Sequence, residues 1–563
     1  MKQLEKLTML QVLNQSAEKF SDSLFLSNID KDSFTYSQFA QKAKEVSTFL
    51  SNEGIIPGDR VAILGENMAN WGIAYYAITT MGAVAVPIMT EFQESQVHHV
   101  LRHSESKAIF VTAKYYGKVE EAECENLTTL ILLDDFSIIP PKTKSDRIKE
   151  VLAEGKKEFS KIKAAALKFV GAMSAEVRED DLASIVYTSG TTGHSKGVML
   201  THKNIVFDAY ASLQLVDVNE TDRLLSILPL FHTIESTLGL TIPLLVGASV
   251  HYMDKPPTAA VLLPALAKIK PTVMISVPLV IEKIYRMKIM PEIQSKAVVR
   301  GLYKIPTVRK KLNKAIGKKL LKTFGGELKI FCIGGAALSA DVEKFLSEAK
   351  FPFAIGYGLT ETAPLVTGTD NFNTRDRSAG TVLNGMEIKI NNPDEATGEG
   401  EVYIKGPNVM KGYYKDPETT KEIMSDDGWF KSGDNAYIDD DGYLFIKGRL
   451  KNVIVGANGK NIYPEEIESV MNEFGYVAES IVFERDDKLV AKVYFDYDLI
   501  DKEFEIQKLT EPEARKKMNE IIQDLLKETN ERVPTFSRLN KIIEQPEPFE
   551  KTPTQKIKRF LYI

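Results

Sequence analysis

The segment from Tyr187 to Gly197 concentrates residues suited to holding an anion. It reads Tyr-Thr-Ser-Gly-Thr-Thr-Gly-His-Ser-Lys-Gly and follows a strand-like run, Ser184 to Val186. Glycines let backbone N–H groups approach and surround an anion. We therefore predict a phosphate-binding loop rather than a merely polar turn. Its hydroxyl and amide donors are Thr188, Ser189, Gly190, Thr191, Thr192 and Gly193, and Lys196 adds a positive charge. The order Lys196-Gly197 differs from the Gly-Lys-Ser/Thr of a Walker A loop.

A second motif, Gly356-Tyr-Gly-Leu-Thr-Glu-Thr362, combines an aromatic ring, hydroxyls and one carboxylate in a turn with glycines. Magnesium in nucleotide sites is usually held by one or two carboxylates together with phosphate oxygens. Glu361 is suited to that role, whereas a glutamate alone in a turn would be read as solvated surface. From its residues alone, the motif is a strand end that opens into a turn flanked by glycines, with a carboxylate of the kind that magnesium accepts.

Other short motifs would be read alone as turns and surface charges. Ile333-Gly-Gly-Ala-Ala337 follows a strand-like run, and backbone at such glycines can approach a flat base closely. Ser432-Gly-Asp434 offers a carboxylate that can accept hydrogen bonds from two hydroxyl groups. Gly448-Arg449-Leu-Lys451 comes next, and a basic run from Lys551 to Arg559 lies near the C-terminus.

In this order the motifs resemble those of the adenylate-forming superfamily, which includes acyl-CoA synthetases, adenylation domains and firefly luciferase. The resemblance covers nearly the whole chain. It implies that the Tyr187–Gly197 loop binds the phosphates of ATP, that Lys196 is catalytic, and that Thr188 and Glu361 hold Mg²⁺. It also implies a nucleotide pocket in which Tyr357 stacks on adenine and Thr360 contacts the α-phosphate, with walls formed by Gly335, Ala336 and Gly358.

The same resemblance assigns Asp434 to the ribose hydroxyls, Arg449 to their support, and Lys451 to the hinge about which a small domain rotates. Lys556 corresponds to the lysine that promotes adenylation, with Lys558 close enough to be an alternative. His232, in Pro229-Leu-Phe-His232, occupies a position that the superfamily places beside the substrate carboxylate. The competing interpretation is a packed core histidine.

Alternating strand-like and helix-like segments must position these residues. Thr35 and Gln38 form a capping box ahead of a helix that Gly54 ends, and a helix rich in small residues spans Trp71 to Thr80. The strand-like runs are Arg60–Leu64, Ala83–Ile88, Ala108–Thr112, Leu130–Leu133, Ser184–Thr188, Thr272–Val277 and Lys329–Ile333. This alternation predicts an α/β fold with largely parallel sheets flanked by helices.

The pattern changes after Gly380, where short β segments with turns predict a β-rich subdomain. Strands near Ile481 to Phe495 and a charged helix near Glu511 to Glu528 follow. We expect an N-terminal adenylation domain over residues 1–450, binding ATP and the acyl substrate. A small mobile α+β domain over residues 451–563 would carry the adenylation lysine.

Composition fits a soluble globular protein: 44% of residues are hydrophobic and 26% are charged. Cys124 and Cys332 cannot form a disulfide framework and favour a reducing, cytoplasmic compartment. A net charge of −6 gives no overall attraction to nucleic acid. The first residues lack the apolar run and small-residue cleavage site of a signal peptide, so none is expected, and the apolar stretch Leu224–Met253 is predicted to be buried core.

The expected reaction joins an acid to AMP, with loss of pyrophosphate, and then to a thiol. Because no carrier module with its serine follows Lys556, we expect coenzyme A as acceptor; an acyl carrier protein, or a non-catalytic binding member of the fold, are the alternatives. Gly358 stands where acetyl-specific relatives carry a tryptophan, so we expect a long-chain fatty acid. Ser276–Tyr285 and the segment Asp146–Ala164 also resemble the long-chain fatty acid:CoA ligase branch.

The segment Arg309–Lys322 carries seven Lys or Arg residues, and Leu312, Ile316 and Leu320 recur every four positions. This spacing predicts a basic amphipathic helix. One function would be peripheral docking on an anionic membrane surface, and the alternative is an ordinary solvated helix face. His98, His99 and His103 include an i,i+4 pair but lack a third zinc ligand, which favours a solvated helix face there too.

Overall fold

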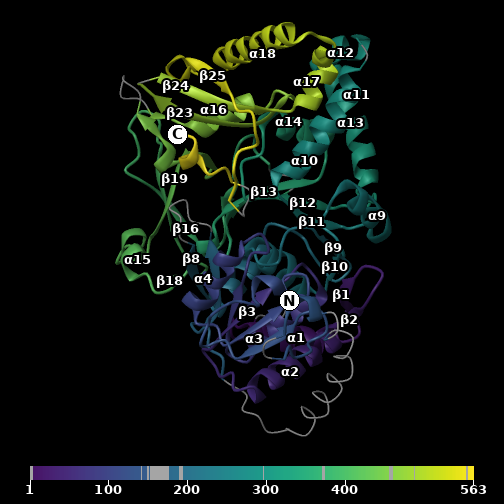
Figure 1. Cartoon of the computed structure of the whole chain (residues 1–563), viewed down its shortest axis with the longest axis vertical. Helices are drawn as coiled ribbons and strands as arrows, with labels where there is room; N and C mark the ends of the chain where they lie inside the picture. Colours follow the sequence, from purple (N-terminus) through teal and green to yellow (C-terminus); the bar gives the residue numbers. More distant parts are fainter. Residues whose placement is uncertain are drawn as a thin grey trace.

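The computed structural model describes residues 4–140, 143–148, 151, 176–188, 195–295, 297–370, 374–455, 461–486, 488–552 and 556–563. Within these residues, two large sheets and a four-stranded sheet form from the chain up to Arg449, and smaller sheets follow (Figure 1). Most neighbours in the two large sheets are parallel, as the sequence predicts for an α/β fold. The segment Asp146–Ala164 lies largely outside the described residues.

The nine-stranded sheet contributes the strands that end at the second and third motifs. Its central strands are parallel, and its β13, β14 and β15 pair antiparallel. In sheet order the strands are β15 (Thr381–Val382), β14 (Leu365–Gly368), β13 (Phe353–Gly358), β12 (Ile330–Ile333), β11 (Val273–Ser276), β9 (Arg223–Ser226), β10 (Ser249–Tyr252), β1 (Leu24–Asn28) and β2 (Ser33–Thr35).

The seven-stranded sheet carries the phosphate-loop motif. Its order is β18 (Gly412–Tyr413), β8 (Lys196–Thr201), β7 (Leu182–Thr188), β4 (Val84–Pro87), β3 (Arg60–Leu64), β5 (Ala108–Val111) and β6 (Thr129–Leu132). Strands β7 and β8 are antiparallel neighbours, so the motif joins the two strands of a hairpin. The sequence patterns did not single out β8.

The predicted β-rich subdomain is an antiparallel four-stranded sheet, in the order β16 (Glu387–Asn391), β17 (Gly400–Lys405), β19 (Phe430–Ile438) and β20 (Leu444–Arg449). Beyond it lie a two-stranded sheet, β21 (Ile454–Val455) and β22 (Asn461–Ile462), and a three-stranded sheet, β23 (Val477–Arg485), β24 (Lys488–Phe495) and β25 (Lys541–Glu544).

Helices cover the sheets. The α-helices are α1 (Met9–Lys19), α2 (Tyr36–Asn52), α3 (Ala69–Thr80), α4 (Glu94–Ser104), α7 (His202–Ser212), α8 (Ile242–Val246), α9 (Ala259–Ile269), α10 (Pro278–Ile284), α11 (Met290–Gln294), α12 (Ala297–Tyr303), α13 (Pro306–Thr323), α14 (Ala340–Ala349), α15 (Pro417–Ile423), α16 (Pro464–Met471), α17 (Tyr497–Phe504) and α18 (Glu511–Arg532). Two π-helices are η3 (Ile234–Thr241) and η4 (Tyr285–Ile289), and the 3₁₀ turns are η1 (Tyr116–Lys118), η2 (Ser145–Arg147), η5 (Thr360–Thr362), η6 (Leu450–Asn452), η7 (Ile506–Lys508), η8 (Thr535–Ser537) and η9 (Arg559–Leu561).

Helix α3 holds the two large sheets together. Nearly all of its residues are buried, which suits a helix that is apolar on every face. A Cβ at its Gly72 would lie 3.1 Å from Leu26 and 3.4 Å from Leu240. Leu26 belongs to β1 of the nine-stranded sheet, and Leu240 belongs to η3. The capping box predicted at Thr35 and Gln38 starts the neighbouring helix α2 and is confirmed.

The last hundred residues have a core of their own. Buried residues from Ile462 to Ile542 pack together, among them Ile467, Val493 and Leu525. The division at residues 450 and 451 stays a prediction. The stretch Leu224–Met253 is largely buried in β9, η3, α8 and β10, as expected. Among the described residues, none of the helices combines the length and the apolar character needed to cross a membrane.

Helix α13 packs closely on α14, and Gly317 allows this approach. A Cβ at Gly317 would lie 2.4 Å from the carbonyl oxygen of Ala349, at the end of α14. Arg309 also ties α13 to α14, donating to both carboxylate oxygens of Glu348 at 2.8 and 3.0 Å. The face of α13 that carries Gly317 is therefore its buried face.

We predict that Gly317→Ala lowers the thermal unfolding midpoint. Overpacking costs about 1–3 kcal/mol, more than the ~1 kcal/mol that alanine gains over glycine in a helix. Gly301→Ala, in α12, is the matched control, because nothing lies within 4 Å of its Cβ position. Equal or higher midpoints for both variants would contradict the close approach of α13 to α14.

Candidate active site

Asp434 is a buried carboxylate at the meeting point of two sheets. The hydroxyl of Tyr357, from β13, donates to its Oδ2 at 2.6 Å. Arg449 stands opposite Asp434 on β20 and binds Oδ1 through Nε at 2.7 Å. Arg449 also donates to the carbonyl of Ser432 at 3.3 Å. Three residues that the sequence assigned to nucleoside recognition thus form one bonded group.

Burial raises the pKa of Asp434, while the Arg449 guanidinium, the Tyr357 hydroxyl and the Lys556 ammonium oppose that shift. Burial, together with the adjacent Asp434 charge, raises the pKa of Tyr357 well above its ordinary value. Tyr357 is therefore a neutral hydroxyl donor at any physiological pH. Its ring is oriented by a bond to the same carboxylate that Arg449 binds.

Glu361 lies in a second polar group, beside the phosphate-loop hairpin. The hydroxyl of Tyr413 donates to its Oε1 at 2.8 Å. The ammonium of Lys196 lies 4.9 Å from the centre of the Tyr413 ring. Thr188 faces Lys196 across the β7–β8 hairpin. The loop residues Ser189, Gly190, Thr191, Thr192 and Gly193 lie outside the described residues.

Tyr413 is a residue that the sequence reasoning missed. It belongs to β18, which pairs with β8 next to Lys196, and the amide of Met410 donates to the carbonyl of Glu361 at 2.8 Å. The segment Gly412-Tyr-Tyr414 offers only a glycine followed by two aromatics, a pattern with no chemistry of its own. Only the pairing of β18 with β8 brings Tyr413 to Glu361.

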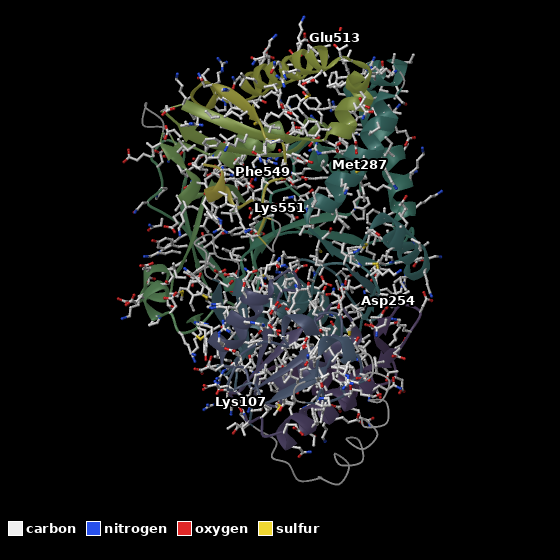
Figure 2. The ribbon with its side chains drawn as sticks, in the orientation of Figure 1. Lys107, Asp254, Met287, Glu513, Phe549 and Lys551 are labelled. Atoms are coloured by element: carbon white, nitrogen blue, oxygen red, sulfur yellow. The ribbon has the colours of Figure 1, made fainter. Side chains whose placement is uncertain are left out.

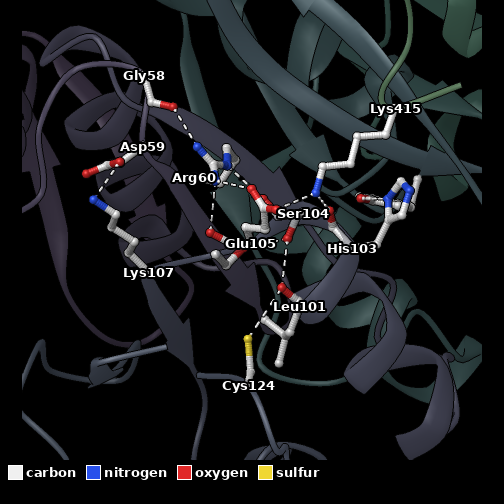
Figure 3. A network of polar contacts seen from close by, with 12 residues as sticks. Gly58, Asp59, Arg60, Leu101, His103, Ser104, Glu105, Lys107, Cys124 and Lys415 are labelled. Atoms are coloured by element: carbon white, nitrogen blue, oxygen red, sulfur yellow. Dashed lines mark hydrogen bonds and ion pairs between the residues drawn. The ribbon is translucent and has the colours of Figure 1, made fainter. Parts of the chain in front are cut away.

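A network of polar contacts gathers at the end of α4, around His103, Glu105, Arg60 and Lys415 (Figure 3). His103 Nδ1 lies 2.7 Å from the hydroxyl of Tyr187, the residue before Thr188. Lys415 binds Glu105 at 2.7 Å and donates to the carbonyl of His103 at 3.0 Å. Arg60 binds Glu105 at 3.0 Å. The end of α4 thereby holds the strand before the loop and the segment after Tyr413.

This network also decides the role of the α4 histidines. His103 is half-buried and bonded to Tyr187, so the expected solvated helix face is wrong for this histidine. Its ring stacks on His99 at 5.5 Å, and burial and the His99 charge lower its pKa. In the described parts of the chain, no three His, Cys, Asp or Glu residues gather in a metal-binding arrangement.

His232 lies in the loop between β9 and η3. Asn67, from the loop after β3, holds this loop: its amide donates to the carbonyl of Leu228 at 2.5 Å and accepts from the N–H of Leu230 at 2.8 Å. Burial, followed by the charge of Lys556, lowers the pKa of His232 to about 4. His232 is thus a neutral imidazole close to Lys556. Asn67 was not identified from the sequence.

Lys556 ends a tight turn near the C-terminus. The amide of Thr552 donates to the carbonyl of Lys556 at 2.7 Å, and the amide of Lys556 donates to Oγ1 of Thr552 at 3.2 Å. Pro553, Thr554 and Gln555 lie outside the described residues. Lys551, just before this turn, lies between the upper and lower halves of the molecule (Figure 2).

The side chain of Lys556 interacts electrostatically with residues that the sequence assigned to ATP and its metal, namely Arg449, Asp434 and Glu361. Much of the residue is exposed to solvent. The protein around its ammonium, and then the charge of Arg449, lower the pKa of Lys556, whereas the charges of Asp434 and Glu361 raise it. Lys558 instead pairs with Glu550 at 3.2 Å. The geometry separates the two lysines and favours Lys556 for the site.

An apolar cleft opens beside these polar groups. It comprises about 820 Å³ of space free of protein atoms, part of it open to solvent. Apolar side chains from the segment after α7, from η3 and from β11 line it, together with the glycines that follow β12 and those of β13. Among the lining residues are Leu215, Leu238, Ile242, Val273, Ile275 and Gly358.

Backbone packing requires a glycine at position 358, independently of the size of the acyl group. A Cβ there would lie 1.8 Å from the carbonyl oxygen of Pro364, so a side chain would displace the backbone. Gly335 and Ala336 are exposed after β12, and Gly335 has a φ of +84°. Thr360 begins η5 directly before Glu361, and Lys451 lies exposed in η6.

Comparison with known proteins agrees with this geometry. The model of the AMP-binding enzyme family matches residues 13–414. The chain belongs to the AMP-binding enzyme family. The crystal structure of ATP-bound MatB from Rhodopseudomonas palustris superimposes on this AMP-binding enzyme with a TM-score of 0.75 at 23% identity, covering 99% of this chain and 98% of that chain, and so shows the same fold.

Curated relatives of this AMP-binding enzyme differ in substrate. A long-chain-fatty-acid–[acyl-carrier-protein] ligase, AEE15 of Arabidopsis thaliana, is 26% identical over 98% of this chain and 84% of its own length. The long-chain-fatty-acid–CoA ligase FadD15 of Mycobacterium bovis is 28% identical, covering 80% of this chain and 74% of that protein. The 4-coumarate–CoA ligase of Vanilla planifolia is also 28% identical, covering 85% and 82%.

We predict that His232 titrates near pH 4 in the folded enzyme. Its folded pKa lies below the ordinary value of 6.5, so His232 stabilises the fold above about pH 6.5 and this contribution is lost as the pH falls toward 4. Histidine NMR with His232→Gln to assign the resonance measures the midpoint. Lys556→Ala should raise it, because a nearby cation disfavours the imidazolium. A midpoint near 6.5 that Lys556→Ala does not move would contradict this electrostatic coupling.

Proposed function

We propose that this enzyme activates a long-chain fatty acid as its acyl adenylate and then transfers the acyl group to coenzyme A. The observation that carries the proposal is the bonded group of Asp434, Tyr357 and Arg449 beside an apolar cleft, because Gly356 and Gly358, on either side of Tyr357, line that cleft. The charge of Lys556 interacts with Asp434, Arg449, Glu361 and His232. The polar groups assigned to the nucleotide therefore lie beside the apolar cleft.

Different polar groups would bind different parts of ATP. Asp434, oriented by Arg449, would accept hydrogen bonds from the ribose hydroxyls, and Tyr357 would stack on adenine against Gly335, Ala336 and Gly358. Thr360 would contact the α-phosphate. Thr188, Lys196 and the loop residues between them would bind the β- and γ-phosphates, since hydroxyl, amide and ammonium donors suit phosphate oxygens.

Glu361 is a suitable Mg²⁺ ligand in this arrangement. Tyr413 donates to one of its carboxylate oxygens, and the other accepts no hydrogen bond within the described residues. One or two carboxylates or hydroxyls together with phosphate oxygens form the usual magnesium set in nucleotide sites, and Thr188 would supply the hydroxyl. A bound Mg²⁺ would neutralise charge on the phosphates.

The chemistry begins with a poor electrophile, the carboxylate. A carboxylate oxygen attacks the α-phosphorus of ATP, the bond to the β-phosphate breaks, and pyrophosphate leaves. Lys556 would stabilise the negative charge that develops on the α-phosphate and carboxylate, in a site where such charges are weakly screened. Neutral His232 would orient the carboxylate. The thiolate of coenzyme A then attacks the acyl carbon, and AMP leaves.

The cleft favours an apolar acid. Each methylene buried in such a cleft contributes roughly 0.8 kcal/mol until the space is filled. The relatives that act on long-chain fatty acids support this choice, and the coumarate ligase identifies an aromatic acid as the alternative. Coenzyme A is the proposed acceptor, with an acyl carrier protein as the alternative.

We propose that residues 451–563 move as a unit about Lys451. Lys556 would be needed in the first half-reaction only, when the carboxylate attacks ATP. A rotation about η6 would then withdraw it and admit the thiol. The exposure of Lys451 and the location of η6 between the four-stranded sheet and the C-terminal core support this hinge.

We predict release of AMP and pyrophosphate, with specificity constants that rise with acyl chain length. A pyrophosphate-release assay over saturated fatty acids of graded length, with 4-coumarate and acetate as comparators, measures the preference. Repeating it with coenzyme A and with an acyl carrier protein identifies the acceptor. Formation of ADP would refute adenylation, and a preference for acetate would refute a long acyl channel.

We predict that Lys556→Ala slows adenylate formation by about a hundredfold or more, because it removes on the order of 3 kcal/mol of transition-state stabilisation. Pyrophosphate exchange measures this half-reaction. Thioester formation from synthetic acyl-AMP should be nearly unchanged. Lys558→Ala is the matched control, since its ammonium pairs with Glu550, and should affect both steps little. Equal loss in both half-reactions would contradict the proposed rotation.

A further inference from the structure

The helical segment 278–323 carries an unusual charge. It contains 13 Lys or Arg residues and 2 Glu residues, a net charge of +11 in a chain whose net charge is −6. The remaining residues therefore carry a net charge of −17. A local excess of this size in an acidic chain creates a strong positive field over one region of the surface.

Helix α13 presents this charge on one face. Its buried positions are Asn313, Gly317 and Leu320, which face the α14 side. The exposed lysines Lys310, Lys311, Lys314, Lys318 and Lys322 fall within about 120° of the helix circumference, on an arc next to that of the buried residues, at 100° per residue. Figure 1 shows α12 and α13 at the right-hand edge of the molecule.

These five lysines have no counter-charge in the described parts of the chain. None of their ammonium groups forms an ion pair or hydrogen bond there, whereas the other cations of the helix are used: Arg309 by Glu348 and Lys319 by Glu292. Structural anchoring therefore explains Arg309 but not the lysine face. Repulsion among neighbouring lysines destabilises a helix. The lysine face therefore does not contribute to the stability of α13.

Exposed apolar side chains lie on α12 and at the start of α13. Val298 and Leu302, four residues apart on α12, are 74% and 43% exposed, and Ile305, just before α13, is 47% exposed. Their neighbours Val299 and Tyr303 point the other way and pack toward the core, with Tyr303 bonded to Asn313. Three large exposed hydrophobics beside a row of lysines suit an interface between water and lipid.

The segment also connects directly to the apolar cleft. Strand β11, whose Val273 and Ile275 line the cleft, runs through Val277 into α10 at the start of the basic segment. A Cβ at Gly335 would lie 3.7 Å from Val277. A lipid surface bound to α12 and α13 would therefore contact the same part of the chain that continues from a wall of the acyl cleft.

We propose that α12 and α13 form a docking surface for an anionic lipid bilayer. The lysines would lie over anionic headgroups while Val298, Leu302 and Ile305 enter the interfacial region. The charge complementarity and the exposed apolar side chains favour a membrane over an acidic protein partner. The biological purpose rests on the proposed function, because an apolar acid dissolves in the bilayer. The binding itself requires neither acid nor ATP.

Sedimentation with vesicles tests the surface. Vesicles of phosphatidylcholine alone and of phosphatidylcholine with phosphatidylglycerol are compared, without fatty acid or ATP. The wild type should bind the anionic vesicles and release at high salt, since salt screens such attraction. Each lysine near an anionic surface contributes roughly fivefold to the binding constant. The triple variant Lys310→Glu, Lys314→Glu, Lys318→Glu should therefore bind on the order of a hundredfold more weakly.

The matched control reverses three exposed charges on α18, with Arg515→Glu, Lys516→Glu and Lys527→Glu. It makes the same change in net charge on a helix rich in acidic residues and should bind almost as well as the wild type. Val298→Ser with Leu302→Ser should weaken the binding that remains at moderate salt. Unchanged circular dichroism and unfolding midpoints show that each variant is folded.

Several results would overturn the proposal. These are no wild-type binding to anionic vesicles, equal losses in the α13 and α18 variants, or binding by the lysine face to an acidic acyl carrier protein but not to vesicles. Activity separates this inference from the proposed function. The α13 variant should keep its rate with detergent-dispersed fatty acid and lose rate only with vesicle-borne acid. An enzyme inactive on every fatty acid that still binds vesicles would refute the function and keep the surface.

Discussion

The carboxylate of Asp434 is buried where the nine-stranded and four-stranded sheets meet, and its partners set how these sheets are related. A buried carboxylate without a partner costs several kcal/mol. Arg449, opposite it on β20, supplies the charge, and Tyr357, from β13, supplies the second donor. The carboxylate is therefore satisfied from two sheets at once, and Asp434 and Arg449 stand opposite each other in the register of β19 on β20.

The seven-stranded sheet is tied to the same centre by other contacts. Tyr413 of β18 bonds to Glu361, which follows β13, and Asn67, after β3, holds the loop that carries His232. Both contacts lie beyond the carboxyl ends of strands. In open α/β sheets this edge is where ligands bind, because helix starts and loop amides gather there. Two sheets meeting at such edges explain why the polar groups converge.

Polar and apolar functions are separated by a thin wall of backbone. The segment Gly356–Gly358 has Asp434 and its partners on one side and the apolar cleft on the other. Because Gly358 packs on the carbonyl of Pro364, the glycine serves the backbone contact as well as the open cleft. An amphipathic substrate, with its charged end at Lys556 and its apolar body in the cleft, matches this division.

Much of the fold followed from local patterns. The strands at 60–64, 84–87 and 108–111, the capping box at Thr35, and the β-rich region after Gly380 were predicted because each depends on its own residues. Alternation of strands and helices predicted the α/β class. The motifs around Tyr357, Asp434 and Lys556 pointed to an adenylating enzyme because, taken in order along the chain, they resemble those of the adenylate-forming superfamily.

Other features depend on residues far apart in the chain. Asn67 and Leu228, Glu361 and Tyr413, or His103 and Tyr187 have no local signature that links them, since strand order and pairing decide such contacts. The resemblance in sequence favoured Lys556 with Lys558 as a nearby alternative, and the ion pair of Lys558 with Glu550 is visible only in the structure. The sequence by itself determined the chemical groups and the elements that hold them. Only the tertiary structure decided which groups meet, because burial and pairing depend on the packing of whole sheets.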